Sequence, residues 1–215
     1  MSGVDDGPWS HNTHYHRVVL GAIPPTCERA MDVGCGQGRL TRQLRQVVPQ
    51  VIGIDRDQRS VELARAHADA AGIGYVLGDF ASVPLRPGSL DFISSVAALH
   101  HMDAETALRQ MADLLRPGGV LAVIGLAGDK LPMCLRWDIP GIVASRTHQA
   151  VDGWQRRRIA PPADSYQSPN LWPPPLSYRE MGELADRVLP GSRFRRRLYW
   201  RYSLTWTKPR PAAIR

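Results

Sequence analysis

The 215-residue sequence has little cysteine and no long hydrophobic run. Its three cysteines are an odd number and show no C-x-x-C spacing, which argues against a disulfide framework or a structural zinc site. The longest apolar run, near 120–127, is too short to span a bilayer. The first twenty residues carry Asp5, Asp6 and three histidines in place of the apolar core of a signal peptide. We therefore expect a cytoplasmic protein without membrane insertion.

Acidic residues are scarce in the last third of the chain. Residues 1–150 contain 14 Lys and Arg against 15 Asp and Glu, whereas residues 151–215 contain 13 against 5. The net charge of +7 therefore comes from the later segment. A solvated basic face explains this surplus, and attraction of an acidic substrate or partner is the alternative.

Glycines cluster where one apolar strand ends. Residues 31–40 read Met-Asp-Val-Gly-Cys-Gly-Gln-Gly-Arg-Leu, and a second strand at 51–55 ends in Asp55, 19 residues after Gly36. An apolar strand, a glycine turn that opens a helix, and an acid on the next strand are typical of a nucleoside-binding α/β unit. A plain strand-to-helix turn is the alternative.

The glycine spacing separates two kinds of cofactor. A dinucleotide site has the pattern G-x-G-x-x-G, but Arg39 stands where its third glycine would be. The glycines here are Gly34, Gly36 and Gly38, which allow positive φ and close approach of a ligand to the backbone. Asp32 just upstream would attract the sulfonium and ammonium of S-adenosylmethionine and repel a pyrophosphate. The spacing therefore favours S-adenosylmethionine.

Hydrophobic periodicity predicts alternating helices and strands in one domain. Leu40, Leu44 and Val47 at helical spacing predict a helix that packs on a sheet. Asp57 is expected to cap a helix that runs to Gly72. The strands are expected at 29–33, 51–55, 74–77, 90–96 and 120–126, with a short helix at 10–20 before them.

The second half of the chain is expected to be less regular. Asp103 should cap a helix that the Pro-Gly-Gly at 117–119 stops, and whose inward face is formed by Ala107, Leu108, Met111, Leu114 and Leu115. The proline-rich segment 127–176 breaks the rhythm and predicts an insertion or lid. A helix at 178–188 and a hairpin of strands at 193–199 and 202–208 follow, the last as a half-buried edge strand.

Polar residues follow the third and fourth predicted strands. Asp79 and Phe80 come directly after one strand, where open α/β sheets bind ligands. The acid can accept from the amine of an adenine and the ring can stack on it, whereas a helix cap is the alternative role for Asp79. His100 and His101 follow the fourth strand and are candidates for a site there.

Five ordered motifs carry a resemblance to a known family. They are Asp-Val-Gly-Cys-Gly-Gln-Gly at 32–38, Gly-Ile-Asp at 53–55, Gly-Asp-Phe at 78–80, Ser-Val-Ala-Ala-Leu-His-His at 95–101 and Leu-Arg-Pro-Gly-Gly at 115–119. In these motifs the chain resembles a class I S-adenosylmethionine-dependent methyltransferase of the small-molecule type, related to the ubiquinone and menaquinone methyltransferases. The resemblance implies a Rossmann-like, seven-stranded, mostly parallel sheet with a C-terminal antiparallel hairpin, in three αβα layers. It also implies one domain over 1–215, with an N-terminal helix and tail at 1–28.

The same resemblance implies residue roles. The methionine portion of the cofactor would lie against Asp32, Gly34, Gly36 and Gly38. Asp55 would bind the ribose hydroxyls, and the adenine would be contacted by Asp79, Phe80 and Arg56, with Val96 completing the cofactor site. The sequence departs from nucleic-acid methyltransferases, because 96–99 is not the Asn/Asp-Pro-Pro-Tyr/Phe run of base amino-group methylation and no Pro-Cys nucleophile occurs.

His100 and His101 are the candidates for a catalytic base. A base would contribute roughly 10² to 10⁴ in rate for a phenol or alcohol, whereas a carboxylate or thiolate acceptor needs little such help. Capping or polar packing is the alternative role for both residues. Together with His11, His14 and His16 they could gather a metal, but no acidic ligand pattern supports this and we expect none.

Three classes of function remain open at this point. The first is methyl transfer to a small-molecule acceptor whose O, N, C or S nucleophile is unassigned, and the acceptor is acidic if the basic surplus serves it. The second is an RNA methyltransferase that uses the basic C-terminal third, although Arg156, Arg157 and Arg158 lack the aromatic interleaving of a stacking platform. The third is a catalytically silent S-adenosylmethionine-binding protein. We expect the first class and no nucleic-acid partner; the oligomeric state is open.

Overall fold

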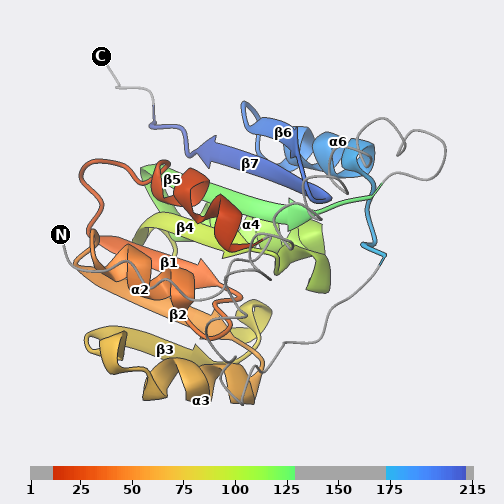
Figure 1. The fold of residues 1–215 in the computed structure, drawn as a ribbon. Coiled ribbons are helices and arrows are strands. Elements are labelled where there is room, and N and C mark those ends of the chain that lie inside the picture. The colour runs from red at the N-terminus through yellow and green to blue at the C-terminus, as the bar shows by residue number, and fades with distance from the viewer. Residues whose placement is uncertain (1–11, 129–172, 212–215) are drawn as a thin grey trace.

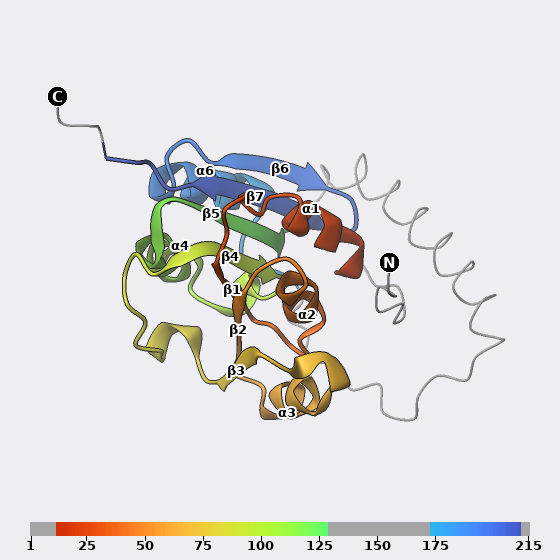
Figure 2. The ribbon, with the colours of Figure 1, turned by 90° about the vertical axis from the view of Figure 1, so that its left-hand side faces the viewer.

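The computed structural model describes residues 12–128 and 173–211, which form one seven-stranded sheet. The strand order is β3-β2-β1-β4-β5-β7-β6, from one edge to the other (Figures 1 and 2). Strands β1 to β5 are parallel, and β7 is antiparallel to both β5 and β6. The strands are β1 (Arg29–Val33), β2 (Gln50–Asp55), β3 (Ile73–Leu77), β4 (Leu90–Val96), β5 (Leu115–Leu126), β6 (Arg193–Arg197) and β7 (Arg201–Thr207).

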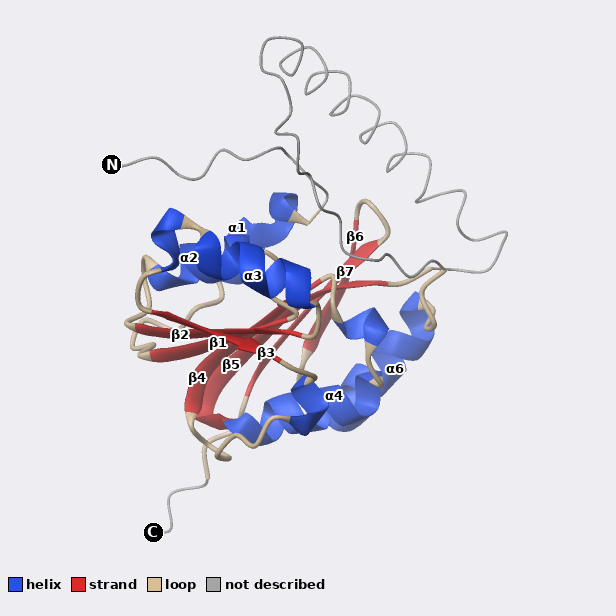
Figure 3. Cartoon of the chain, turned by 90° about the horizontal axis from the view of Figure 1, so that it is seen from below, coloured by secondary structure: helices blue, strands red, loops and turns tan. Residues whose placement is uncertain are grey.

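Helices cover both faces of this sheet, as Figure 3 shows. One face carries α1 (His16–Leu20), α2 (Arg39–Arg45) and α3 (Gln58–Ala66), and the other carries α4 (Ala104–Leu114) and α6 (Tyr178–Val188). The larger apolar core lies beneath α4 and α6, and a second core lies beneath α1 and α2. The predicted three-layer αβα architecture with a C-terminal antiparallel hairpin is confirmed. None of the described helices has the length and apolar character needed to cross a bilayer.

Side-chain caps set the helix starts that point toward the carboxyl end of the parallel strands. Asp57 accepts from the Ser60 amide at 2.9 Å, and Asp103 accepts from the Thr106 amide at 2.8 Å, so both predicted caps are confirmed. Helix α6 begins with a capping box in which Ser177 accepts from the Glu180 amide. Each cap satisfies an amide that the first helical turn leaves without a partner.

Two helices are shorter than predicted. Helix α2 ends at Arg45, so Val47 lies outside it and is 63% exposed instead of facing the sheet. Helix α3 ends at Ala66, because the His67 ring accepts from the Asp69 amide and starts a separate 3-10 turn. Tertiary contacts and local side-chain bonds override the longer apolar periodicity at both places.

Two strands also differ from the prediction. Strand β5 begins at Leu115, so the Pro-Gly-Gly at 117–119 lies within a strand with an irregular register and not in a loop. Leu115 is buried, but in β5 and not on the helix. Strand β7 is an inner strand buried on both faces, and β6 forms the edge. Even the polar Ser203 of β7 is only 4% exposed, so the face that was predicted to be open to solvent is buried at this position.

The predicted insertion or lid at 127–176 lies almost wholly outside the described residues, as do Arg156, Arg157 and Arg158.

Candidate functional site

The glycine turn between β1 and α2 forms the centre of the site. Gly34, Gly36 and Gly38 have φ of 73°, 52° and 75°, in the left-handed region that glycine adopts at low cost. A Cβ on Gly34 would lie 2.1 Å from the Cβ of Ala98, so only glycine fits between β1 and the end of β4. The Ile54 carbonyl accepts from the Gly34 amide at 2.8 Å, which fixes the turn to β2.

Asp32 lies directly before this turn and is buried, at 2% exposure. Its two carboxylate oxygens accept from the hydroxyls of Thr41 and Ser94, each at 2.8 Å. Burial raises the pKa of Asp32 to about 6, against the lowering effect of these two hydrogen bonds. Sequence reasoning found Asp32 but not Thr41 or Ser94, whose spacing from it carries no local signal.

Asp55, at the end of β2, holds the glycine turn from the other side. Its carboxylate accepts from the Gly36 amide at 2.7 Å and from the Asp57 amide at 2.9 Å. The structure thus brings Asp55 to the turn that lies 19 residues before it, as the spacing predicts. Arg56 is exposed beside it, and its charge lowers the pKa of His101 across the site.

Asp79 and Phe80 lie at the end of β3 but differ in their surroundings. Asp79 is exposed, and its carboxylate accepts from the Ala81 amide at 3.0 Å, so it has the capping role that was the alternative. The Phe80 ring is 3% exposed and packs in the larger core. The ring therefore has little exposed surface in this structure, and its stacking on an adenine stays a prediction.

The end of β4 leads into the two histidines. Val96 is half-buried, and the next residue, Ala97, has φ of 54° although it is not glycine. The His100 and His101 rings lie 4.0 Å apart between centroids. His100 is 7% exposed, and neither of its ring nitrogens has a hydrogen-bond partner within the described ranges. A buried polar group without a partner is rare enough to need a reason.

The electrostatics keep both histidines neutral at pH 7. Burial, then the charges of His101 and Arg201, lower the pKa of His100 to about 4. Burial and then the charge of Arg56 also lower the pKa of His101, while Asp55 opposes the shift. A neutral imidazole offers one N–H donor and one nitrogen acceptor, so His100 can both donate and accept.

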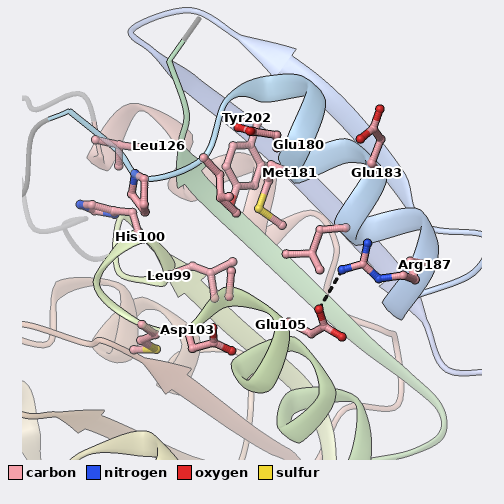
Figure 4. A pocket seen from close by; sticks show the side chains of 15 residues that line it. Leu99, His100, Asp103, Glu105, Leu126, Glu180, Met181, Glu183, Arg187 and Tyr202 are labelled. Atoms are coloured by element: carbon pink, nitrogen blue, oxygen red, sulfur yellow. Dashed lines mark hydrogen bonds and ion pairs between the residues drawn. The ribbon is translucent and has the colours of Figure 1, made fainter.

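A groove of about 410 Å³ opens beside His100, between α4 and α6 (Figure 4). Its floor is apolar and includes Leu99, Leu126, Met181, Leu184 and Tyr202. Its rim is acidic, formed by Asp103, Glu105, Glu180 and Glu183, with Arg187 as the basic member. The rim groups bind one another or their own helices; Arg187 donates to Glu105 at 2.8 Å across the groove.

Tyr15 and His16 pack against other parts of the fold. Tyr15 is 5% exposed, and its hydroxyl donates to the Leu198 carbonyl at 3.0 Å, so its side chain packs in the fold. The His16 ring lies 2.8 Å from the Gln43 side-chain oxygen. No three His, Cys, Asp or Glu side chains of residues 12–128 and 173–211 gather in a way that could hold a metal ion.

A glycine turn and a carboxylate at the strand switch point of a doubly wound sheet define a nucleoside-binding Rossmann-like protein. Residues 31–123 match the methyltransferase domain family. An uncharacterised methyltransferase of Mycobacterium tuberculosis is 32% identical over 206 residues, which are 95% of this chain and 99% of the relative. The chain belongs to the methyltransferase family, and the protein is an S-adenosylmethionine-dependent methyltransferase.

Two further comparisons are partial or distant. A ubiquinone biosynthesis O-methyltransferase of Bordetella bronchiseptica is 33% identical over 99 residues, 43% of this chain and 40% of the relative. The structure of a methyltransferase from Aquifex aeolicus superposes with a TM-score of 0.56 at 16% identity, covering 89% of this chain and 88% of that one. The second comparison shows the shared fold alone.

Proposed function

We propose that this methyltransferase acts on a small-molecule acceptor bound at the carboxyl end of β4, next to His100. The observation that carries the proposal is that some polar groups at this end of the sheet have hydrogen-bond partners within the described ranges, whereas His100 has none. The carboxylates near β1 and β2 are already placed by hydrogen bonds around a glycine turn, whereas His100 beside β4 has no partner within the described ranges. An acceptor beside His100 would supply that partner.

The residues around the glycine turn fit S-adenosylmethionine. Asp32 would attract the ammonium of the methionine portion, which would lie against the backbone of Gly34, Gly36 and Gly38. Asp55 has carboxylate lone pairs beyond the two amides that it accepts from, so it can take the ribose hydroxyls. Asp79, with Arg56, would lie beside the adenine and Val96 beside the rest of the cofactor.

When bound, S-adenosylmethionine supplies an electrophilic methyl group on its sulfonium. The chain's own contribution is mainly orientation, which can lower the barrier by up to about 7 to 11 kcal/mol when the reacting atoms are held near contact. A group with a pKa of about 4 is a weak proton acceptor at neutral pH, so the surroundings of His100 favour a positioning hydrogen bond over proton removal. His101, with a smaller shift, remains the better candidate for a base.

Labelled methyl transfer tests this proposal. The protein is incubated with radiolabelled S-adenosylmethionine and a cell extract, which is then separated into small molecules, RNA and protein. Label should enter the small-molecule fraction, and Asp55→Ala should reduce it through weaker cofactor binding. Label in RNA would favour the RNA-methylating alternative. Cofactor binding without label in any fraction would favour a catalytically silent protein.

A further inference from the structure

A buried arginine at the same end of the sheet has no acidic partner among the residues that the structure describes. Arg201, the first residue of β7, is 8% exposed and pairs in register with Leu126 at the end of β5. Its guanidinium donates to the Tyr199 carbonyl at 3.1 Å and to the Asn12 side-chain oxygen at 2.7 Å. Its Nε has no partner, and no carboxylate pairs with it, within 12–128 and 173–211.

An arginine charge buried among neutral acceptors is costly. Burial lowers the pKa of Arg201 to about 10, and the charge is nevertheless retained at neutral pH. Interior charges in folded proteins are usually paired, because the loss of hydration is otherwise uncompensated. Asn12 and the Tyr199 carbonyl satisfy two N–H groups but do not neutralise the charge. Among the described residues the charge of Arg201 thus has no neutralising partner, which a bound anion would supply.

His100 is within electrostatic reach of this arginine. After burial and His101, the charge of Arg201 is a further cause that lowers the pKa of His100, and both His100 ring nitrogens lack partners among the described residues. Arg201 pairs in register with Leu126, so the two side chains lie on the same side of this strand pair, and Leu126 lines the groove that His100 also lines. His100 therefore lies where the groove approaches Arg201 and can donate to the same anion.

The backbone next to Arg201 is strained. Tyr199 and Trp200 form the turn of the β6–β7 hairpin with φ of 60° and 55°, a conformation that usually requires Asn or Gly. Together with Ala97 they are the non-glycine residues of the described part with positive φ, and all three lie at the carboxyl end of the parallel strands. Such strain persists where the surroundings enforce it, and it often marks a functional site.

We propose that Arg201 and His100 bind an anionic group of the acceptor, so that the acceptor is a carboxylate-bearing small molecule. This inference rests on the proposed function. A planar guanidinium matches the two oxygens of a carboxylate, and the single charge of Arg201 balances a single negative charge. A phosphate dianion would leave one charge uncompensated. Arg196 and Arg197 are less suited, because they lie over the Tyr178 ring and donate to Ser203 respectively.

Matched ligands test the site without knowledge of the acceptor. The protein loaded with S-adenosylhomocysteine is titrated with propionate and benzoate, with propionamide and benzamide, and with inorganic phosphate, at constant ionic strength. The melting temperature should rise with the carboxylates and not with the amides, because only ligands that bind the folded state stabilise it. Phosphate should bind more weakly than the carboxylates; tighter phosphate binding would overturn the assignment of a carboxylate.

Substitutions test whether Arg201 is the residue that binds the carboxylate. Arg201→Gln should weaken carboxylate binding about tenfold or more, and Arg201→Lys should retain part of it. Asn12→Ala removes a partner of Arg201 but not its charge, so it should keep the response. Arg195→Gln, on the exposed side of β6, is the matched control and should behave as the wild type. Equal carboxylate binding by wild type and Arg201→Gln would overturn the inference.

Two measurements keep this test separate from folding and from the proposed function. If Arg201→Gln does not fold, the ring nitrogen signals of His100 in the wild type should shift with propionate, and its pKa should rise because a negative charge lies nearby. Unmoved signals would overturn the inference. Calorimetry with S-adenosylhomocysteine tests the cofactor site by itself: absent binding contradicts the proposed function, whereas normal binding without a carboxylate response contradicts only the anion site.

Discussion

The two halves of the site differ in how their polar groups are satisfied. The cofactor half, at the ends of β1, β2 and β3, contains Asp32, Asp55 and Asp79, each of which accepts hydrogen bonds from neighbouring hydroxyls or amides. The acceptor half, at the ends of β4, β5 and β7, contains His100 and Arg201, which have unpartnered buried nitrogens among the described residues. The polar groups of the first half are thus held by the chain itself, whereas we propose that the acceptor supplies the missing partners in the second.

The backbone shows the same contrast. Positive φ falls on glycine at Gly34, Gly36 and Gly38 in the cofactor half, where it costs little. In the acceptor half it falls on Tyr199 and Trp200, where the cost is of order 1 to 3 kcal/mol for each residue. Backbone strain is therefore found at the end of the sheet where we propose that the acceptor binds, and not in the glycine turn proposed to bind the cofactor.

Gly34→Ala, in the cofactor half, should have the largest destabilising effect of the substitutions considered. The new Cβ would meet Ala98 at 2.1 Å in a left-handed conformation, so both overpacking and backbone strain oppose it. We expect a loss of about 2 to 5 kcal/mol in the free energy of unfolding, measured by urea denaturation.

Gly36→Ala and Gly191→Ala are the controls for this substitution. Both glycines have positive φ, but a Cβ on either would meet nothing within 4 Å. They should therefore show only the strain component, of about 1 to 2 kcal/mol. A loss at Gly34 equal to that at Gly191 would show that the contact with Ala98 does not matter.

The contributions of Asp32 and His100 to the free energy of unfolding should change with pH in opposite directions. The pKa of Asp32 is raised to about 6 from 3.8, so the folded state retains a proton that the unfolded state loses. Its contribution to stability is full below about pH 4 and is lost by about pH 6, an effect on the order of 3 kcal/mol. The pKa of His100 is lowered to about 4, so its contribution is full above pH 6.5 and is lost as the pH falls toward 4.

Two substitutions test these opposite pH dependences of the free energy of unfolding one at a time. Asp32→Asn should make stability fall more steeply as the pH drops from 6 to 4, because the compensating carboxyl is gone. His100→Asn should have the opposite effect over the same range. Urea denaturation at several pH values measures both. Parallel pH profiles for the two variants would contradict the assignment of opposite shifts.

Much of the fold could be predicted because its signals are local. The spacing of Gly34, Gly36 and Gly38, the caps Asp57 and Asp103, and the apolar strands are each encoded within a few residues. The position of β7 inside the sheet could not be predicted, since strand order depends on contacts with β5 and β6 that alternation does not reveal.

The candidate site likewise contains residues that could be predicted from the sequence and residues that could not. Asp32 and Asp55 stand in motifs, so their positions could be predicted, and their contact with the glycine turn is confirmed for Asp55. Ser94 could not be found from sequence, because it donates to Asp32, 62 positions away. The proposed role of Arg201 likewise depends on its burial and on its effect on His100, 101 positions away. The basic surplus of the last third allowed an acidic ligand as one of two explanations but indicated no particular arginine, and the anion site at Arg201 is a proposal from the structure.

Asp55→Ala should weaken binding within the cofactor half. If its carboxylate accepts from the ribose hydroxyls, S-adenosylhomocysteine should bind less tightly by about 1.5 to 3 kcal/mol, as measured by calorimetry. Part of that loss could come from the glycine turn, whose Gly36 amide also donates to Asp55. Asp55→Asn keeps one acceptor for that amide and should lose less. Unchanged affinity in folded Asp55→Ala would contradict the ribose assignment.

The smallest effect is expected at the rim of the groove. Arg187 donates to Glu105 at 2.8 Å and joins α6 to α4, but the two side chains are 59% and 40% exposed (Figure 4). Exposed ion pairs contribute about 0 to 1 kcal/mol, because water and salt screen them. Arg187→Gln should therefore change the free energy of unfolding by less than about 1 kcal/mol, and 1 M salt should reduce the difference further.

Arg179→Gln, which breaks a pair within α6 alone, is the matched control. A loss well above 1 kcal/mol at Arg187 alone would show that the rim of the acceptor half is held as firmly as the cofactor half, and the contrast between the two would then be limited to His100, Arg201 and the strained turn.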